Sequence, residues 1–185
     1  MQPASSSPPA IVALRPTTPA DATVLKSWRE QGSVGRHQPL GEVTTAQLRA
    51  ELAGYRHNGL YRGRGEKFQW IVTVDREPAG WITLVVTNWD HGLAEFGYAL
   101  ATAYQGRGLM APAIEQLLAD LFLNTAIERL EARCSVDNVA SQKVLEKLAF
   151  RREGLLRGYF RLRGERVDNY LYAMLRQDYF DLTPR

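Results

Sequence analysis

A short glycine turn, Gln105-Gly106-Arg107-Gly108-Leu109-Met110, is the stretch of this sequence best suited to bind an anion. It follows a strand-like run and opens a helix-like run that extends to about Leu123. Glycine has no Cβ, so two glycines separated by one residue allow the backbone to turn sharply. The free N–H groups of the turn and of the helix N-terminus attract anions, and a diphosphate fits best. An ordinary strand-to-helix turn is the alternative interpretation.

The elements that position this turn follow from the hydrophobic pattern. Apolar and β-branched runs predict strands at residues 11–14, 68–74, 79–87, 93–100, 128–136, 150–156 and 167–175. Apolar residues at helical spacing predict helices at residues 19–30, 46–57, 109–123, 139–148 and 177–182. Residues 157–165 are predicted to form a basic loop or hairpin arm. This order predicts an α/β (α+β) fold, with one mixed central sheet of about seven strands and helices on both faces.

The length of 185 residues favours one domain with a sizeable core. Residues 1–10 are rich in Pro and Ser, which predicts a disordered lead-in before a domain at residues 11–183. They lack the pattern of a signal peptide, and no apolar run is long enough to cross a membrane. The single cysteine, Cys134, permits no disulfide within the chain, which fits a cytoplasmic protein. We expect it to be a buried strand thiol rather than a nucleophile.

The net charge of +3 is too small an excess to predict direct nucleic-acid binding. Residues 151–166 are basic with interleaved aromatics, which suits either an anionic partner or arginine stems that cover apolar surface. The three histidines, His37, His57 and His91, have no metal-ligand spacing. The sequence therefore predicts no metal site, and it places these histidines in loops or on the surface.

Four stretches together resemble the GCN5-related N-acetyltransferase (GNAT) superfamily, and within it the ribosomal-protein N-terminal acetyltransferases of the RimJ/RimL type. They are residues 95–100, the glycine turn, residues 137–150, and the C-terminal pair 153–157 and 168–170. The resemblance extends from about Ile11 to Phe180. It implies a single GNAT-like domain whose sheet is splayed at a coenzyme A site.

The resemblance also implies a reaction, the transfer of an acetyl group from acetyl-CoA to a primary amine by direct attack. The diphosphate of the coenzyme would lie on Gln105, Gly106, Arg107, Gly108, Leu109 and Met110. Backbone groups of Leu100 and Ala101 would bind the pantetheine arm, together with Asn138. The role of Asn138 has an alternative, because asparagine is also a common helix N-cap.

Proton transfer in such a site needs a base and a donor. An ammonium group must lose a proton before it attacks, and the resemblance makes Glu95 the expected base. A surface charge at a strand edge is the equal alternative for Glu95. The resemblance makes Ser141 the expected hydrogen-bond donor to the leaving thiolate, although it could be an exposed helix serine. Tyr98, Tyr159 and Tyr170 are alternative donors.

Two positions depart from the superfamily pattern. Leu145 stands where many members carry a tyrosine donor, so that role is vacant there. Ala149 replaces the usual glycine before Phe150, which predicts an altered local backbone.

The expected function is therefore acetyl-CoA-dependent N-acetylation of a protein N-terminal α-amine, with a ribosomal protein as a possible acceptor. A small-molecule amine, such as an antibiotic or an amino-acid derivative, is the alternative. Trp28 is expected in the core by default, although Trp28 and the loop after it could line the acceptor pocket. A module that binds acyl-CoA without catalysis is the rival from another class. Monomer and homodimer both remain open.

Overall fold

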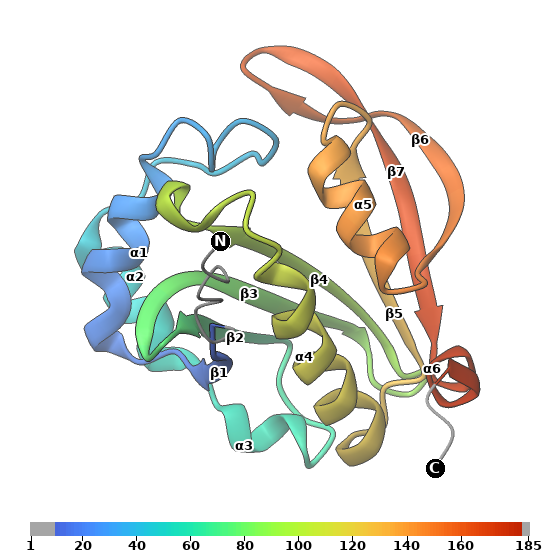
Figure 1. Ribbon diagram of the computed structural model, residues 1–185. Coiled ribbons are helices and arrows are strands. Elements are labelled where there is room, and N and C mark those ends of the chain that lie inside the picture. Colours follow the sequence, from blue (N-terminus) through green and yellow to red (C-terminus); the bar gives the residue numbers. More distant parts are fainter. Residues whose placement is uncertain (1–9, 183–185) are drawn as a thin grey trace, which may run out of the picture.

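The computed structural model describes residues 10–182, arranged around one seven-stranded sheet (Figure 1). The sheet order is β1-β2-β3-β4-β5-β7-β6, and the neighbouring strands are antiparallel except for β4 and β5. The strands are β1 (Val12–Pro16), β2 (Lys67–Val74), β3 (Glu77–Asn88), β4 (Leu93–Leu100), β5 (Arg129–Ser135), β6 (Arg151–Leu162) and β7 (Glu165–Leu175). The predicted mixed sheet is confirmed. Apart from Ala10, the predicted lead-in lies outside the described residues.

Helices cover both faces of this sheet (Figure 1). They are α1 (Ala22–Arg29), α2 (Thr45–Gly54), α3 (His57–Leu60), α4 (Met110–Asn124), α5 (Val139–Lys147) and α6 (Arg176–Leu182). Single 3-10 turns precede α1 and follow β4. Among residues 10–182, no helix has the length and apolarity needed to cross a bilayer.

The alternation of side chains along each strand divides the core into two layers. On one face, Trp70, Ile82 and Leu84 pack with residues of α4 and α5. On the other face, Ile71 and Trp81 pack with residues of α1 and α2. Both faces of the central strands are therefore buried, which explains why β2 and β3 carry nearly continuous apolar runs.

The splay of the sheet lies between β4 and β5. These parallel strands pair only over Leu93–Glu95 and residues 129–131. Beyond that point the rest of β4 and of β5 diverge, as Figure 1 shows. The divergence leaves backbone groups at the open end without a partner strand across the gap, as the predicted splay requires.

Helix α4 begins where the sequence predicted, near Leu109, which is its N-cap residue. Pro112 is then the third residue of the helix. The first N–H groups of a helix have no partner within the helix, so proline removes no hydrogen bond at this position. The first turn of α4 therefore accommodates Pro112 without a lost hydrogen bond.

One helix prediction was wrong in detail. The helix predicted at residues 46–57 ends at Gly54, because Tyr55 is extended, and α3 follows separately. Of the two alternatives for the basic segment at residues 157–165, the hairpin arm is the one found. Strand β6 continues to Leu162 past a bulge at Gly158, and a tight turn at Arg163 and Gly164 leads into β7.

Ala149 replaces the glycine that is usual at this position of the superfamily, yet its backbone adopts a conformation that glycine usually adopts. Ala149 has a left-handed φ of 61° at the end of α5. Its N–H donates to the Glu146 carbonyl, and the N–H of Phe150 donates to the Leu145 carbonyl, each at 3.0 Å. These two hydrogen bonds form a Schellman motif. With alanine at this position, the left-handed conformation costs about 1 kcal/mol more than it would with glycine, because alanine has a Cβ.

Candidate active site

A pocket of about 600 Å³ lies at the open end of the splay. Its walls come from the loop after α1, the end of β4 with the glycine turn, and the first half of α5. The predicted site residues in this lining are Leu100, Gln105, Gly106, Gly108, Leu109, Met110, Asn138 and Ser141. Ala101, Arg107 and Glu95 lie outside it. A second hollow of similar volume, between α1 and the start of α2, contains no predicted site residue.

The glycine turn has the backbone that its sequence predicted. Gly106 and Gly108 both have a left-handed φ of 72°, and a Cβ at either one would meet open space. Among residues 10–182, no protein acceptor takes the N–H groups of residues 106–108. Arg107 stacks over the ring of Tyr104 at 5.6 Å. The turn therefore has unused donors and a nearby cation, which suit an anion.

A pair of hydroxyl groups joins the two sides of the pocket. Tyr98 on β4 and Ser141 on α5 lie 2.7 Å apart, Oη to Oγ. Burial raises the pKa of the Tyr98 phenol, although its bond to Ser141 works in the opposite direction. The phenol therefore stays protonated at neutral pH and can supply a hydrogen bond to Ser141.

The environment of Ser141 explains two further predictions. Asn138 caps α5, since its side-chain oxygen accepts from the Ser141 N–H at 3.2 Å. Its amide nitrogen donates no hydrogen bond within residues 10–182. Cys134 is buried beside this pair, and burial raises the pKa of its thiol to about 11. A protonated strand thiol is what the sequence predicted.

The other tyrosines predicted as alternative donors have aromatic roles elsewhere. Tyr159 stacks with Arg133 at 5.3 Å, and Tyr170 stacks with Arg152 at 4.6 Å. Leu145, at the position of the vacant tyrosine, is fully buried in the core. Of the three tyrosines, only Tyr98 lines the pocket.

Glu95 lies at the closed end of the splay, on the sheet face that carries α1 and α2. Its carboxylate forms an ion pair with Arg133. Alternating charges continue this contact through Glu131 and Arg129, with distances of 3.2 Å and 2.8 Å. The series ends at Glu153 on β6. We call these five residues the charge ladder.

The loop at residues 31–42 is fastened to the end of β4 by side-chain hydrogen bonds. Gln38 donates to the Tyr98 carbonyl at 2.6 Å. The side-chain oxygen of Gln31 accepts from the N–H of Thr102 at 2.8 Å and from its hydroxyl at 2.9 Å. Ser33 lies 2.7 Å from the same hydroxyl. These bonds hold the loop as one wall of the pocket.

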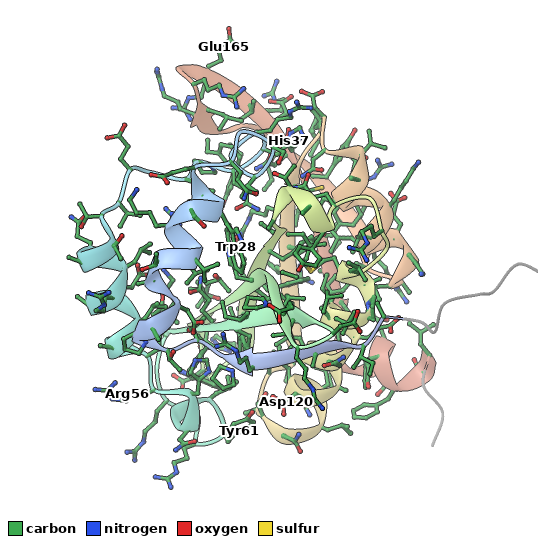
Figure 2. The ribbon with its side chains drawn as sticks, turned by 60° about the vertical axis from the view of Figure 1, so that its left-hand side comes forward. Trp28, His37, Arg56, Tyr61, Asp120 and Glu165 are labelled. Carbon is green, nitrogen blue, oxygen red and sulfur yellow. The ribbon has the colours of Figure 1, made fainter. Side chains whose placement is uncertain are left out.

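His37 also belongs to this wall, and the sequence analysis did not predict that it lines the pocket. It was predicted as a loop or surface residue, and it does lie in a loop, but its side chain lines the pocket. Figure 2 shows it below the β6–β7 hairpin, whose end residue Glu165 points outward. No local motif marks His37. The only available signal was that the loop after the first helix borders the splay.

Trp28 has a structural role instead of lining the pocket. It stacks on Trp81 with ring centres 6.2 Å apart and planes inclined by 9°. Both rings are buried between α1 and the sheet. The loop after α1 therefore borders the pocket without this tryptophan.

Comparisons with known proteins agree with this geometry. A family model described as an acetyltransferase (GNAT) domain matches residues 12–151. An uncharacterised N-acetyltransferase, p20 of Bacillus licheniformis, is 27% identical over 159 residues, covering 86% of this chain and 89% of the relative. The ribosomal-protein-serine acetyltransferase of Escherichia coli is 32% identical over 118 residues, covering 64% and 66%. The structure of Mycobacterium smegmatis RimJ in complex with CoA-disulfide superposes with a TM-score of 0.80 at 25% identity, covering 94% and 84%.

Proposed function

The chain belongs to the GNAT acetyltransferase family and is an acetyl-CoA-dependent N-acetyltransferase, and from this premise we propose that it acetylates the N-terminal α-amine of a protein. One relative supports this acceptor class, the enzyme of Escherichia coli named as a ribosomal-protein-serine acetyltransferase. A ribosomal protein is the acceptor that this name suggests.

The observation that carries the proposal is the pocket, whose lining includes residues of the glycine turn and both hydroxyl-bearing residues, Tyr98 and Ser141. The turn at residues 105–110 would hold the diphosphate of acetyl-CoA with its free N–H groups. The free amide nitrogen of Asn138 and the Leu100 carbonyl would hold the pantetheine arm. The Ala101 backbone, predicted for the same role, is already engaged, because its N–H donates to the Ala79 carbonyl and its carbonyl accepts from the Tyr104 N–H, each at 2.8 Å. Arg107, outside the lining, would contribute charge rather than a direct contact.

One adjustment follows from a glutamine contact. The Leu100 carbonyl already accepts a hydrogen bond from Gln105 at 2.8 Å. A pantetheine arm that used this carbonyl would replace the glutamine amide. The exchange conserves the number of hydrogen bonds, so its net cost is small.

The reaction forms a C–N bond between the amine and the acetyl carbon and breaks the C–S bond. Ser141 is the proposed donor to the departing sulfur, with Tyr98 hydrogen-bonded behind it. The Tyr98 phenol can restore the Ser141 proton, because its own raised pKa keeps it protonated. Glu95 remains the base that the sequence predicts, although its carboxylate is paired with Arg133.

A thiol-release assay tests the acceptor class. Acetyl-CoA is supplied with peptides that carry a free N-terminus, with the same peptides blocked at the N-terminus, and with polyamines and amino acids. We expect free-N-terminus peptides to have a kcat/KM at least tenfold above the other amines, with the acetyl group located on the α-nitrogen by mass spectrometry.

Three outcomes contradict the proposal. A preference for polyamines or amino acids would identify a small-molecule acetyltransferase. Tight acetyl-CoA binding without thiol release to any amine would identify a binding module. Acylation of blocked peptides at lysine would also exclude the α-amine as the acceptor.

A further inference from the structure

The pocket contains no carboxylate among the described residues that line it. Its ionisable side chains are those of Arg36, His37, Tyr98 and Lys143. Arginine and lysine are protonated at neutral pH, and the Tyr98 phenol is protonated as well. His37 is therefore the one lining side chain that can accept a proton near neutral pH.

The candidate base from the sequence is placed less favourably for that task. Glu95 lies outside the pocket lining, at the closed end of the splay. Its carboxylate is held by Arg133, which also contacts Glu131 and stacks on Tyr159. Proton transfer to Glu95 would weaken this ion pair in the step that needs the base.

The charges around His37 come from three elements. Arg36 belongs to the same loop, Asp137 lies in the turn before α5, and Arg163 lies in the turn between β6 and β7. Burial lowers the pKa of His37 first, and the two arginines lower it further, whereas Asp137 opposes them. Lys143, from α5, adds positive charge to the same pocket. The neutral imidazole is therefore the form present at pH 7.

The position of His37 is fixed through its neighbour. Gln38 donates to the carbonyl of Tyr98, the residue whose hydroxyl bonds Ser141. His37 is thus tied by one residue to the strand that carries the hydroxyl pair, while Gln31 and Ser33 tie the start of the loop to Thr102. His37 and the hydroxyl pair therefore line the same pocket from different elements.

We propose that His37 is the general base of this acetyltransferase, taking a proton from the ammonium form of the acceptor. Its neutral ring nitrogen removes one proton, and the freed lone pair forms the C–N bond. The C–S bond breaks, the second amine proton passes to solvent water as the amide forms, and the thiolate takes the Ser141 proton, which is replaced from Tyr98 and then from solvent. The inference rests on the proposed transfer reaction and is independent of which amine is the acceptor.

The test is the pH dependence of kcat/KM for the full chain and for His37→Gln, with the best amine from the thiol-release panel. With His37 as base, the wild type uses the ammonium form, so its rate is level between the pKa of His37 and that of the amine, about 8 for an α-amine. His37→Gln can use only the free amine, so its rate rises tenfold per pH unit up to that pKa. At pH 7 only about a tenth of an α-amine is in the free form, so we expect a loss of about tenfold, narrowing toward pH 9.

His91→Gln is the matched control, since His91 is exposed in the turn between β3 and β4. It should keep the wild-type profile. Acetyl-CoA binding by calorimetry should agree within about threefold among all three proteins, which separates chemistry from binding and folding. His37→Gln with a wild-type profile, or a profile change found in Glu95→Gln instead, would overturn the proposal. If the acceptor belongs to a different class, the same test is run with that amine. If the wild type is inactive toward every amine, both the proposed transfer reaction and the proposed role of His37 are wrong.

Discussion

Strands β4 and β5 are paired at one end and separated at the other, and the two ends carry different chemistry. At the closed end, Glu95 opposes Glu131 across the strand pair, and arginines connect them into the charge ladder. At the open end, Tyr98 lies 2.7 Å from Ser141 with no charged partner in the contact. The glycine turn and His37 complete this second region.

From this contrast we infer that the closed end serves stability and the open end serves the reaction. Each carboxylate of the charge ladder forms an ion pair with an arginine of the ladder, so protonating one of them disturbs several ion pairs. Hydroxyl groups at the open end exchange protons without leaving a buried charge unpaired. We therefore expect mutations at the open end to affect turnover, and mutations in the ladder to affect mainly the free energy of unfolding.

The largest expected effect comes from the hydroxyl pair. Ser141→Ala should lower kcat about 100-fold, and Tyr98→Phe about tenfold, because each removes part of the path that protonates the sulfur. The double variant should be little slower than Ser141→Ala, since the two groups act as one unit. Steady-state kinetics with acetyl-CoA affinity measured in parallel checks this.

A matched control for Tyr98→Phe is Tyr61→Phe. Tyr61 donates to Asp120 at 2.8 Å, and Figure 2 shows both residues on the far side of the molecule from His37. Its kcat should equal that of the wild type. If Tyr98→Phe and Ser141→Ala also retain full kcat, the open end is not the proton path and the contrast between the two ends fails.

The next effect concerns the glycine turn, and it should appear in binding. In Gly108→Val a β-branched side chain is forced to a φ of 72°, which costs about 1–2 kcal/mol or moves the turn. Acetyl-CoA affinity by calorimetry should fall at least about tenfold. Gly54→Val, at the end of α2 with open space and no left-handed φ, should bind normally. Equal affinity in the two variants would exclude the turn as the diphosphate site.

Most of the fold was predictable, because its information is local and periodic. The apolar runs of β2, β3 and β4 and the helical spacing in α4 define their elements within a few residues. Prediction was wrong or undecided where local signals were weak: Tyr55 interrupts a helical pattern, and the arginine-rich length of β6 resembles a loop in composition. An edge strand in solvent tolerates such residues, so its pattern carries less information.

The site was predictable where a backbone constraint appears in the sequence. Gly106 and Gly108 predict a turn, and Asn138 predicts a helix N-cap. The contacts across the sheet are different, since nothing near Ser141 predicts Tyr98 as its partner. The same holds for Arg133 beside Glu95 and for His37 in the pocket wall. Their sequence separations are long, and only the tertiary fold brings them together.

A smaller effect is expected when the ladder loses its central cation. Arg133→Met leaves Glu95 and Glu131 without their shared guanidinium, so the free energy of unfolding should fall by about 1–2 kcal/mol, a modest value because the ladder is partly exposed to water. Chemical denaturation measures this. Turnover at pH 7 should stay within about threefold. A large gain in turnover would mean that the released Glu95 is a competent base, and a loss above tenfold would place the ladder in the chemistry.

The smallest effect should appear as a pH dependence at the end of the ladder. The hydrogen bonds from Arg129 lower the pKa of the Glu153 carboxyl, so this carboxylate stabilises the fold above the ordinary glutamate pKa, and the gain is lost as pH falls through the lowered value. Because Glu153 is well exposed, screening limits the gain to a few tenths of a kcal/mol. Urea unfolding of the wild type and Glu153→Gln should therefore differ slightly at pH 7 and converge by about pH 3, and the difference should shrink in 1 M salt. Asp181→Asn provides the comparison outside the ladder, on exposed α6, and should show no such convergence. A Glu153 difference that persists at pH 3 would come from packing, and the outer end of the ladder would then have no electrostatic role.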